Sequence, residues 1–144
     1  MMEVCVVDYG GGNVRSLCNA LDYVGARYRV SDDPEFVERA ERIIFPGVGN
    51  FGSVMENLRK RGLDDAIVKA INDGAKFFGI CVGMQALFNE SEESPGVKGL
   101  GILKGKVARF TSGKVPQIGW NDVRPSKKSI FSGIAFLTDN ALKT

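Results

Sequence analysis

The sequence contains no histidine among its 144 residues. This absence removes the imidazole that commonly acts as a general base beside a nucleophilic cysteine, and it removes the commonest metal ligand in proteins. The three cysteines, at positions 5, 18 and 81, are odd in number and widely spaced, so they indicate neither a disulfide framework nor a zinc site. We expect no metal, and we expect Cys5 and Cys18 to be inert core thiols.

Long apolar runs are also absent. No stretch approaches the roughly 20 residues that span a bilayer, and the N-terminus opens directly into EVCVVDY without the features of a secretory signal. The net charge of +2 is too small to indicate binding to nucleic acid. We therefore predict a cytoplasmic protein that contacts neither membrane nor nucleic acid.

Positive charge is concentrated in one segment, residues 104–128, whose single acidic residue is Asp122. Its basic residues are Lys104, Lys106, Arg109, Lys114, Arg124, Lys127 and Lys128. This basic band is either a solvated face of short strands or a docking surface for an acidic partner, and composition leaves both interpretations open.

The apolar pattern alternates between strands and helices, which favours a parallel sheet with helices on both faces. Beyond Ser94 the pattern changes to short, glycine-punctuated strands, expected as hairpins or edge strands attached to the sheet. The expected strands are 3–10, 27–33, 40–49 and 75–80. Helices are expected at 12–25, twice between 51 and 73, and again from the segment 83–91, which starts the next helix. The short strand patterns are 96–110 and 114–123. We predict a single α/β domain over residues 1–144.

Three polar or glycine-rich turns follow strands in this pattern: Asp8-Tyr9-Gly10, Pro46–Gly49 and the turn at Cys81. Ligand sites in parallel sheets lie at the carboxyl ends of the strands. The three turns therefore predict one site.

The segment Gly79–Gly83 has the G-x-S-x-G spacing of a nucleophile elbow, with Cys81 in place of serine. The Val82 amide would then be one oxyanion donor, and the PGVG turn at 46–49 would supply a second. The alternative interpretation of Cys81 is a small buried residue at a tight turn. The alternative for the PGVG segment is an ordinary strand-to-helix turn.

The DYGGGN segment at 8–13 also allows a Rossmann-like nucleotide-binding interpretation. Gly10 and Gly12 match G-x-G, and Asp32 or Asp33 lies at a suitable distance for a ribose contact. Arg15 occupies the third glycine position, so the match is weak.

Five segments together resemble the glutaminase subunits of imidazole glycerol phosphate synthase, class I (triad) glutamine amidotransferases of histidine biosynthesis. They are DYGGGNVRS, PGVGNFG, GICVGMQALF, GLGILKGKV and VPQIGWN, in that order between about residues 3 and 134. The resemblance implies glutamine hydrolysis to glutamate, without a cofactor. The ammonia would pass to a (β/α)8-barrel cyclase partner, in a heterodimer that makes imidazole glycerol phosphate and AICAR.

The resemblance also implies roles for individual positions. Cys81 would be the nucleophile and Val48 and Val82 the backbone oxyanion donors. Glutamine would be held by Gly47, Gly49 and Gln85. The cyclase would be contacted by Asn13, Pro116, Gln117, Ile118, Gly119, Trp120 and Asn121.

The chain departs from the family pattern at the remaining triad positions. The family's late histidine and glutamate are missing, and Gln117 replaces another usual histidine. We therefore expect a glutaminase-type domain that is incomplete at its C-terminus and impaired or inactive as given. The alternative function is a non-catalytic pseudo-glutaminase that docks on the cyclase barrel.

Overall fold

The computed structural model describes residues 3–113. Residues up to Arg109 form one compact unit, and Phe110 begins a second, of which residues 110–113 are described. The elements are β1 (Val4–Val7), α1 (Val14–Tyr23), β2 (Tyr28–Ser31), α2 (Pro34–Glu38), β3 (Arg42–Gly47), α3 (Phe51–Lys60), α4 (Leu63–Asn72), β4 (Lys76–Cys81), α5 (Val82–Gln85), β5 (Phe88–Ser91) and β6 (Leu103–Val107).

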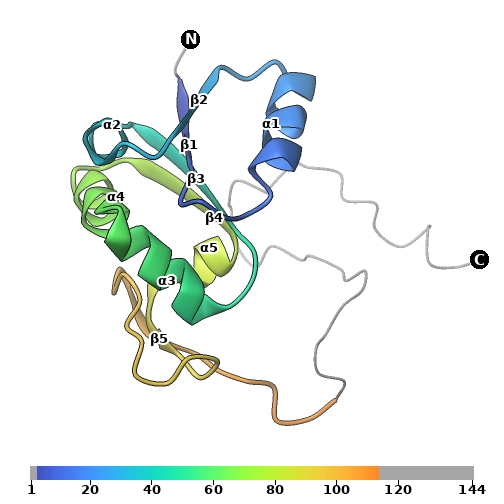
Figure 1. Ribbon diagram of the computed structural model, residues 1–144, viewed down its shortest axis with the longest axis vertical. Helices are drawn as coiled ribbons and strands as arrows, with labels where there is room; N and C mark the ends of the chain where they lie inside the picture. Colours follow the sequence, from blue (N-terminus) through green and yellow to red (C-terminus); the bar gives the residue numbers. More distant parts are fainter. Residues whose placement is uncertain (1–2, 114–144) are drawn as a thin grey trace, which may run out of the picture. The chain divides into compact units, whose positions relative to one another are not determined.

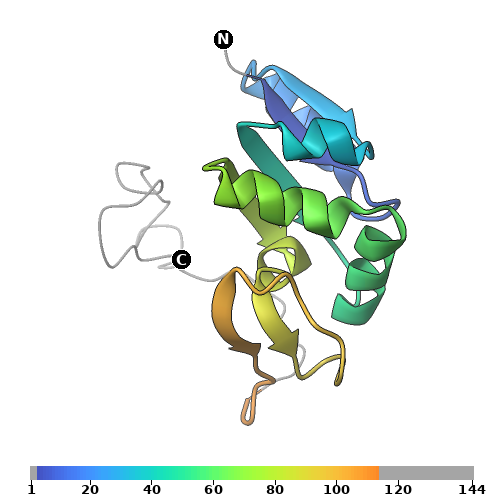
Figure 2. The same ribbon diagram turned by 90° about the vertical axis from the view of Figure 1, so that its left-hand side faces the viewer.

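The main sheet has four strands in the order β2-β1-β3-β4, and every neighbouring pair is parallel. Helix α1 lies on one face of this sheet, and α2, α3 and α4 lie on the other (Figures 1 and 2). The predicted α/β class, with a mostly parallel sheet and helices on both faces, is confirmed. The prediction of a single domain over residues 1–144 stays a prediction.

The core lies between the sheet and the layer of α2, α3 and α4. Apolar side chains of β1 and β3 face apolar positions of these helices, and Phe45, Leu58, Leu63 and Ile67 are completely buried. The α1 face is covered less fully, because Leu21 is the buried residue of α1 and Ile80 of β4 remains 37% exposed. Helices therefore cover one face of the sheet more fully than the other.

Three helices begin where the sequence supplies a capping side chain. The side chain of Asn13 accepts from Ser16 N–H before α1, that of Asp33 from Glu35 N–H before α2, and that of Asn50 from Gly52 N–H before α3. Such caps satisfy N–H groups that a helix start leaves unpaired. Helix α2 was not predicted, although its Asp-Pro start is a recognised signal.

The prediction of a helix starting at 83–91 is wrong beyond its first turn. Helix α5 ends at Gln85, and β5 occupies 88–91. The N–H groups of Leu100 and Leu103 donate to the carbonyls of Ala86 and Leu87. Those carbonyls would have to accept within a continuing helix, so the chain that folds back over this segment stops the helix.

The short strand predicted within 96–110 exists as β6, but its pairing differs from the prediction. It pairs in parallel with β5 in a separate two-stranded sheet, so it is neither a hairpin nor an extension of the main sheet. The pattern at 114–123 and the basic band beyond Gly113 lie outside the described residues. Within residues 3–113, no helix has the length and apolar character needed to cross a membrane.

The two thiols predicted to be inert differ in their surroundings. Cys5 is buried as predicted, whereas Cys18 on the thinly covered α1 is half-buried, which corrects the prediction of a core thiol. Burial raises the pKa of the Cys5 thiol from 9.0 to about 11. The thiol of Cys5 therefore stays protonated in the folded protein at neutral pH.

This raised pKa predicts a loss of stability in alkali. Above about pH 9 the unfolded chain loses the Cys5 proton while the folded chain keeps it, so the free energy of unfolding falls until about pH 11, by about 2 kcal/mol. Urea unfolding from pH 8 to 11 measures this slope. The Cys5→Ala variant should show a flatter curve over that window, and parallel curves for the two proteins would contradict the assignment.

Candidate active site

The strand register brings the cysteine turn and the PGVG turn together. Gly47, the last residue of β3, pairs with Cys81, the last residue of β4. From the end of β1, the Tyr9 hydroxyl reaches the backbone of Val48, with an oxygen–nitrogen distance of 3.3 Å. All three turns singled out in the sequence therefore meet at the carboxyl edge of the sheet.

Cys81 is exposed and has an unusual backbone conformation. Its φ is 55° and its ψ is −118°, and within residues 3–113 it is the one non-glycine residue with positive φ. Such a conformation costs roughly 1–3 kcal/mol and persists where the surrounding structure imposes it. The strain and the exposure together match a nucleophile elbow better than a small buried residue at a tight turn.

Glycines allow the close backbone contacts that impose this conformation. A Cβ on Gly83 would lie 2.0 Å from the carbonyl oxygen of Phe45, and one on Gly79 would lie 2.6 Å from the carbonyl oxygen of Gly83. A Cβ on Gly47 would lie 2.4 Å from the nitrogen of Gly83. The G-x-C-x-G spacing thus lets α5 press directly on β3 and β4.

The remaining predicted site residues lie around this turn. Val82 is buried at the start of α5, where helical N–H groups have no intrahelical acceptor. Gln85 ends α5 and is half-buried, and Val48 is 54% exposed. Gly49 has a φ of 102°, and nothing lies within 4 Å of the position that a Cβ would take there. Gly47 is buried within β3, where its visible role is close packing.

The predicted partner-contact residues are described only in part. Asn13 is exposed and caps α1, so its amide carries a structural role as well. Pro116–Asn121 lie outside the described residues. In the basic band, Lys106 forms an ion pair with Glu92 at 2.6 Å, and Arg109 N–H donates to the same carboxylate. Glu92 therefore offsets positive charge at the N-terminal end of the band.

Sequence reasoning named Tyr9 only as part of a turn, and it missed Arg61 and Glu93, which also build the site's frame. The Tyr9 side chain joins the first two turns, Arg61 Nε donates to the Tyr9 carbonyl at 3.1 Å, and the Glu93 carboxylate accepts from Phe51 N–H at 2.8 Å. Glu93 thereby occupies an N–H group at the start of α3, directly after the PGVG turn. These contacts link residues 39 to 52 positions apart, so no local sequence pattern indicates them.

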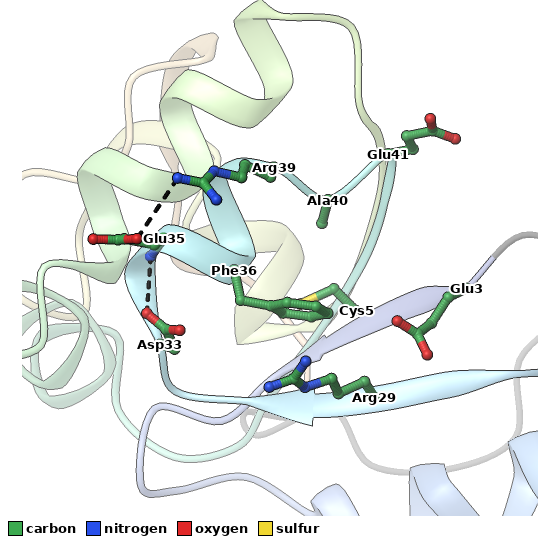
Figure 3. A pocket seen from close by; sticks show the side chains of 9 residues that line it. All are labelled: Glu3, Cys5, Arg29, Asp33, Glu35, Phe36, Arg39, Ala40 and Glu41. Carbon is green, nitrogen blue, oxygen red and sulfur yellow. Dashed lines mark hydrogen bonds and ion pairs between the residues drawn. The ribbon is translucent and has the colours of Figure 1, made fainter.

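A hollow of about 410 Å³ lies away from these turns, beside α2 (Figure 3). Arg29 lies over the Phe36 ring there, 4.2 Å from its centroid. Glu3 and Glu41 precede β1 and β3, so the hollow lies toward the amino ends of the strands. It is therefore separate from the edge that carries Cys81.

Comparisons with known proteins agree with this geometry. A family model described as a CobB/CobQ-like glutamine amidotransferase domain matches residues 9–123. The imidazole glycerol phosphate synthase subunit HisH of Chlorobaculum tepidum is 48% identical over 129 residues, covering 88% of this chain and 64% of that protein. The same subunit of Thermus thermophilus is 45% identical over 120 residues, covering 83% and 61%.

A crystal structure of a glutamine amidotransferase superposes with a TM-score of 0.65 at 27% identity, covering 77% of this chain and 59% of that one. The chain spans about three fifths of the length of the curated relatives described above. The family match extends over most of this chain, and nearly half of the aligned residues are identical in the two relatives. The chain therefore belongs to the CobB/CobQ-like glutamine amidotransferase family.

Proposed function

We propose that this chain carries the nucleophile and oxyanion donors of a glutaminase. Cys81 attacks the side-chain carbonyl carbon of glutamine, and the N–H groups of Val48 and Val82 stabilise the negative charge that develops on the carbonyl oxygen. The pairing of Gly47 with the exposed Cys81 carries this proposal, because it sets the nucleophile beside the turn that holds Val48.

The proposed reaction proceeds in two steps. A bond forms between Cys81 Sγ and the amide carbon, the carbon–nitrogen bond breaks, and the thiol proton leaves with the ammonia. Water then cleaves the thioester to give glutamate and the free thiol. Gly47, Gly49 and Gln85 would hold the glutamine.

The ammonia acceptor and the setting are further parts of the proposal. Ammonia passes to a (β/α)8-barrel cyclase subunit in a cytoplasmic heterodimer, which uses it to make imidazole glycerol phosphate and AICAR. Both HisH relatives are named as subunits of imidazole glycerol phosphate synthase, which supports a partner of this kind. Asn13 and Pro116–Asn121 are the contact residues that we propose.

Acylation by an activated substrate tests the nucleophile. The sequence contains no histidine to protonate a leaving amine, so the p-nitrophenyl γ-ester of glutamate is the suitable donor, because p-nitrophenolate departs with its bonding electron pair. We expect a γ-glutamyl thioester on Cys81, located by peptide mass mapping. Labelling that is absent, or that is equal on Cys18, would contradict the proposal.

The absence of histidine supports a second candidate function, a pseudo-glutaminase that docks on the cyclase barrel without turnover. Gel filtration of the chain with a cyclase subunit, with glutamate release measured on the eluted complex, separates the two functions. Co-elution without glutamate release supports the docking module. A Trp120→Ala variant that binds the cyclase as tightly as wild type would count against the proposed interface.

A further inference from the structure

The Tyr9 side chain is held in place by several contacts, and the proposed glutaminase reaction assigns it no role. It is 2% exposed, and its ring packs edge-on against Phe45 with the centroids 5.3 Å apart. The glycine turn wraps around the ring, because a Cβ on Gly11 would lie 2.8 Å from it and one on Gly12 would lie 3.2 Å from the hydroxyl oxygen. The hydroxyl therefore has little freedom to move away from Val48.

The hydroxyl contacts the two peptide groups on either side of Val48. The Val48 N–H donates to the Tyr9 oxygen at 3.3 Å, and the Tyr9 O–H donates to the Val48 carbonyl oxygen at 3.4 Å. The Val48 side chain is 54% exposed. The buried Tyr9 hydroxyl thus holds Val48, a half-exposed residue of the PGVG turn, through both the N–H and the carbonyl of Val48.

The first of these contacts engages the N–H that the proposed function assigns to the oxyanion. A single N–H points well at one acceptor, so the Tyr9 oxygen and a substrate oxyanion compete for it. A charged acceptor makes a hydrogen bond roughly twice as strong as a neutral one. The oxyanion therefore displaces the hydroxyl, but only after overcoming the existing bond.

We propose that Tyr9 is a positioning residue that holds the Val48 backbone in a resting orientation and must yield the Val48 N–H before acyl transfer at Cys81. The proposal rests on the proposed function in assigning Val48 to the oxyanion. The Tyr9 hydroxyl keeps its bond to the Val48 carbonyl and retakes the N–H when the acyl group leaves. The turn then returns to its resting orientation.

The state of the hydroxyl is consistent with this role. Burial, above all, raises the pKa of Tyr9, and the charges of Cys81 and Asp8 add to the effect while the hydrogen bond from Val48 opposes it. The hydroxyl therefore remains protonated at neutral pH and serves as donor and acceptor at once.

The Tyr9→Phe variant tests the proposal because it keeps the ring and its packing on Phe45. Without the hydroxyl, the Val48 N–H has no competing acceptor from this residue. We expect acylation by the p-nitrophenyl γ-ester to become about 3- to 10-fold faster, the equivalent of one neutral hydrogen bond, with KM unchanged. Tyr23→Phe, at a side chain 92% exposed, is the matched control and should behave as wild type.

Alkylation of Cys81 by iodoacetamide separates positioning from a general change in the site, because that reaction forms no oxyanion. Its rate, followed by mass mapping, should be equal in Tyr9→Phe and wild type. An unchanged or slower acylation in Tyr9→Phe would overturn the proposal. So would an equal acceleration of both reactions, because that result would mean only that Cys81 had become more accessible.

Hydrogen exchange of the Val48 amide, measured by NMR, gives a readout that needs no chemistry at Cys81. We expect exchange about 3- to 10-fold faster in Tyr9→Phe, with Tyr23→Phe unchanged. If wild type is not acylated at all, the proposed function fails. The exchange rate of the Val48 amide then decides separately whether Tyr9 holds Val48. An equal rate in Tyr9→Phe and wild type would show that it does not.

Discussion

The Cys81→Ala variant is expected to lose acylation by the activated ester completely, with a rate at least about 10³-fold below that of wild type. The sulfur is the atom that forms the thioester, and of the other two cysteines Cys5 is buried and Cys18 is half-buried within α1. The substitution removes only the thiol, because alanine keeps the Cβ. Stopped-flow release of p-nitrophenolate measures the rate.

A companion substitution at the same position separates chemistry from stability. Cys81 has a φ of 55°, where residues with a Cβ are strained and glycine is not. Cys81→Gly should therefore have a free energy of unfolding about 1 kcal/mol or more above that of Cys81→Ala. Urea unfolding of the two variants measures the difference. Equal stabilities would show that the elbow stores no strain, and acylation that persisted in either variant would exclude Cys81 as the nucleophile.

The Gly83→Ala variant is expected to lose about 4 kcal/mol or more of folding free energy. The added Cβ would lie 2.0 Å from the carbonyl oxygen of Phe45, and because that atom belongs to the backbone of a buried strand, no side-chain rotation relieves the overlap. Ordinary overpacking costs about 1–3 kcal/mol, and losses above about 4 indicate a defect of this kind. Urea unfolding followed by circular dichroism measures the change.

Gly25→Ala is the control for this substitution. Gly25 also lacks a side chain, but nothing lies within 4 Å of the added Cβ, so only its φ of 67° resists alanine. A cost of about 1–2 kcal/mol is expected. If Gly83→Ala cost no more than Gly25→Ala, the close approach of α5 to β3 would not exist in solution.

The parallel sheet and the turns that follow its strands were predictable because short apolar runs closed by turn residues have few other solutions, although the strands end one to three residues from the predicted positions. The register of β3 and β4, which the pattern did not predict, brings Gly47 opposite Cys81. The spacing of Gly79, Cys81 and Gly83 was informative for a physical reason: each glycine stands where a Cβ would meet backbone. Such requirements leave a signature in local sequence.

The features that were not predicted depend on partners distant in the chain. The helix after Cys81 ends early because residues 99–103 take up the carbonyls of residues 86–89, and nothing in GMQALFNES encodes that. The Tyr9 hydroxyl reaches Val48 across 39 positions, and the glycine turn that wraps it resembles a nucleotide-binding loop. Asp32, a ribose candidate in that interpretation, instead lies 3.7 Å from Arg61 in an ion pair.

The nucleophile and its two oxyanion donors are tested most directly by a crystal structure of the chain after reaction with a chloroketone analogue of glutamine, which alkylates a thiol and leaves a carbonyl one carbon from the sulfur. We expect the adduct on Cys81, with the carbonyl oxygen about 2.7–3.1 Å from the Val82 nitrogen and facing the Val48 turn. An adduct on another residue, or a carbonyl on Cys81 that points away from both valine backbones, would contradict this expectation.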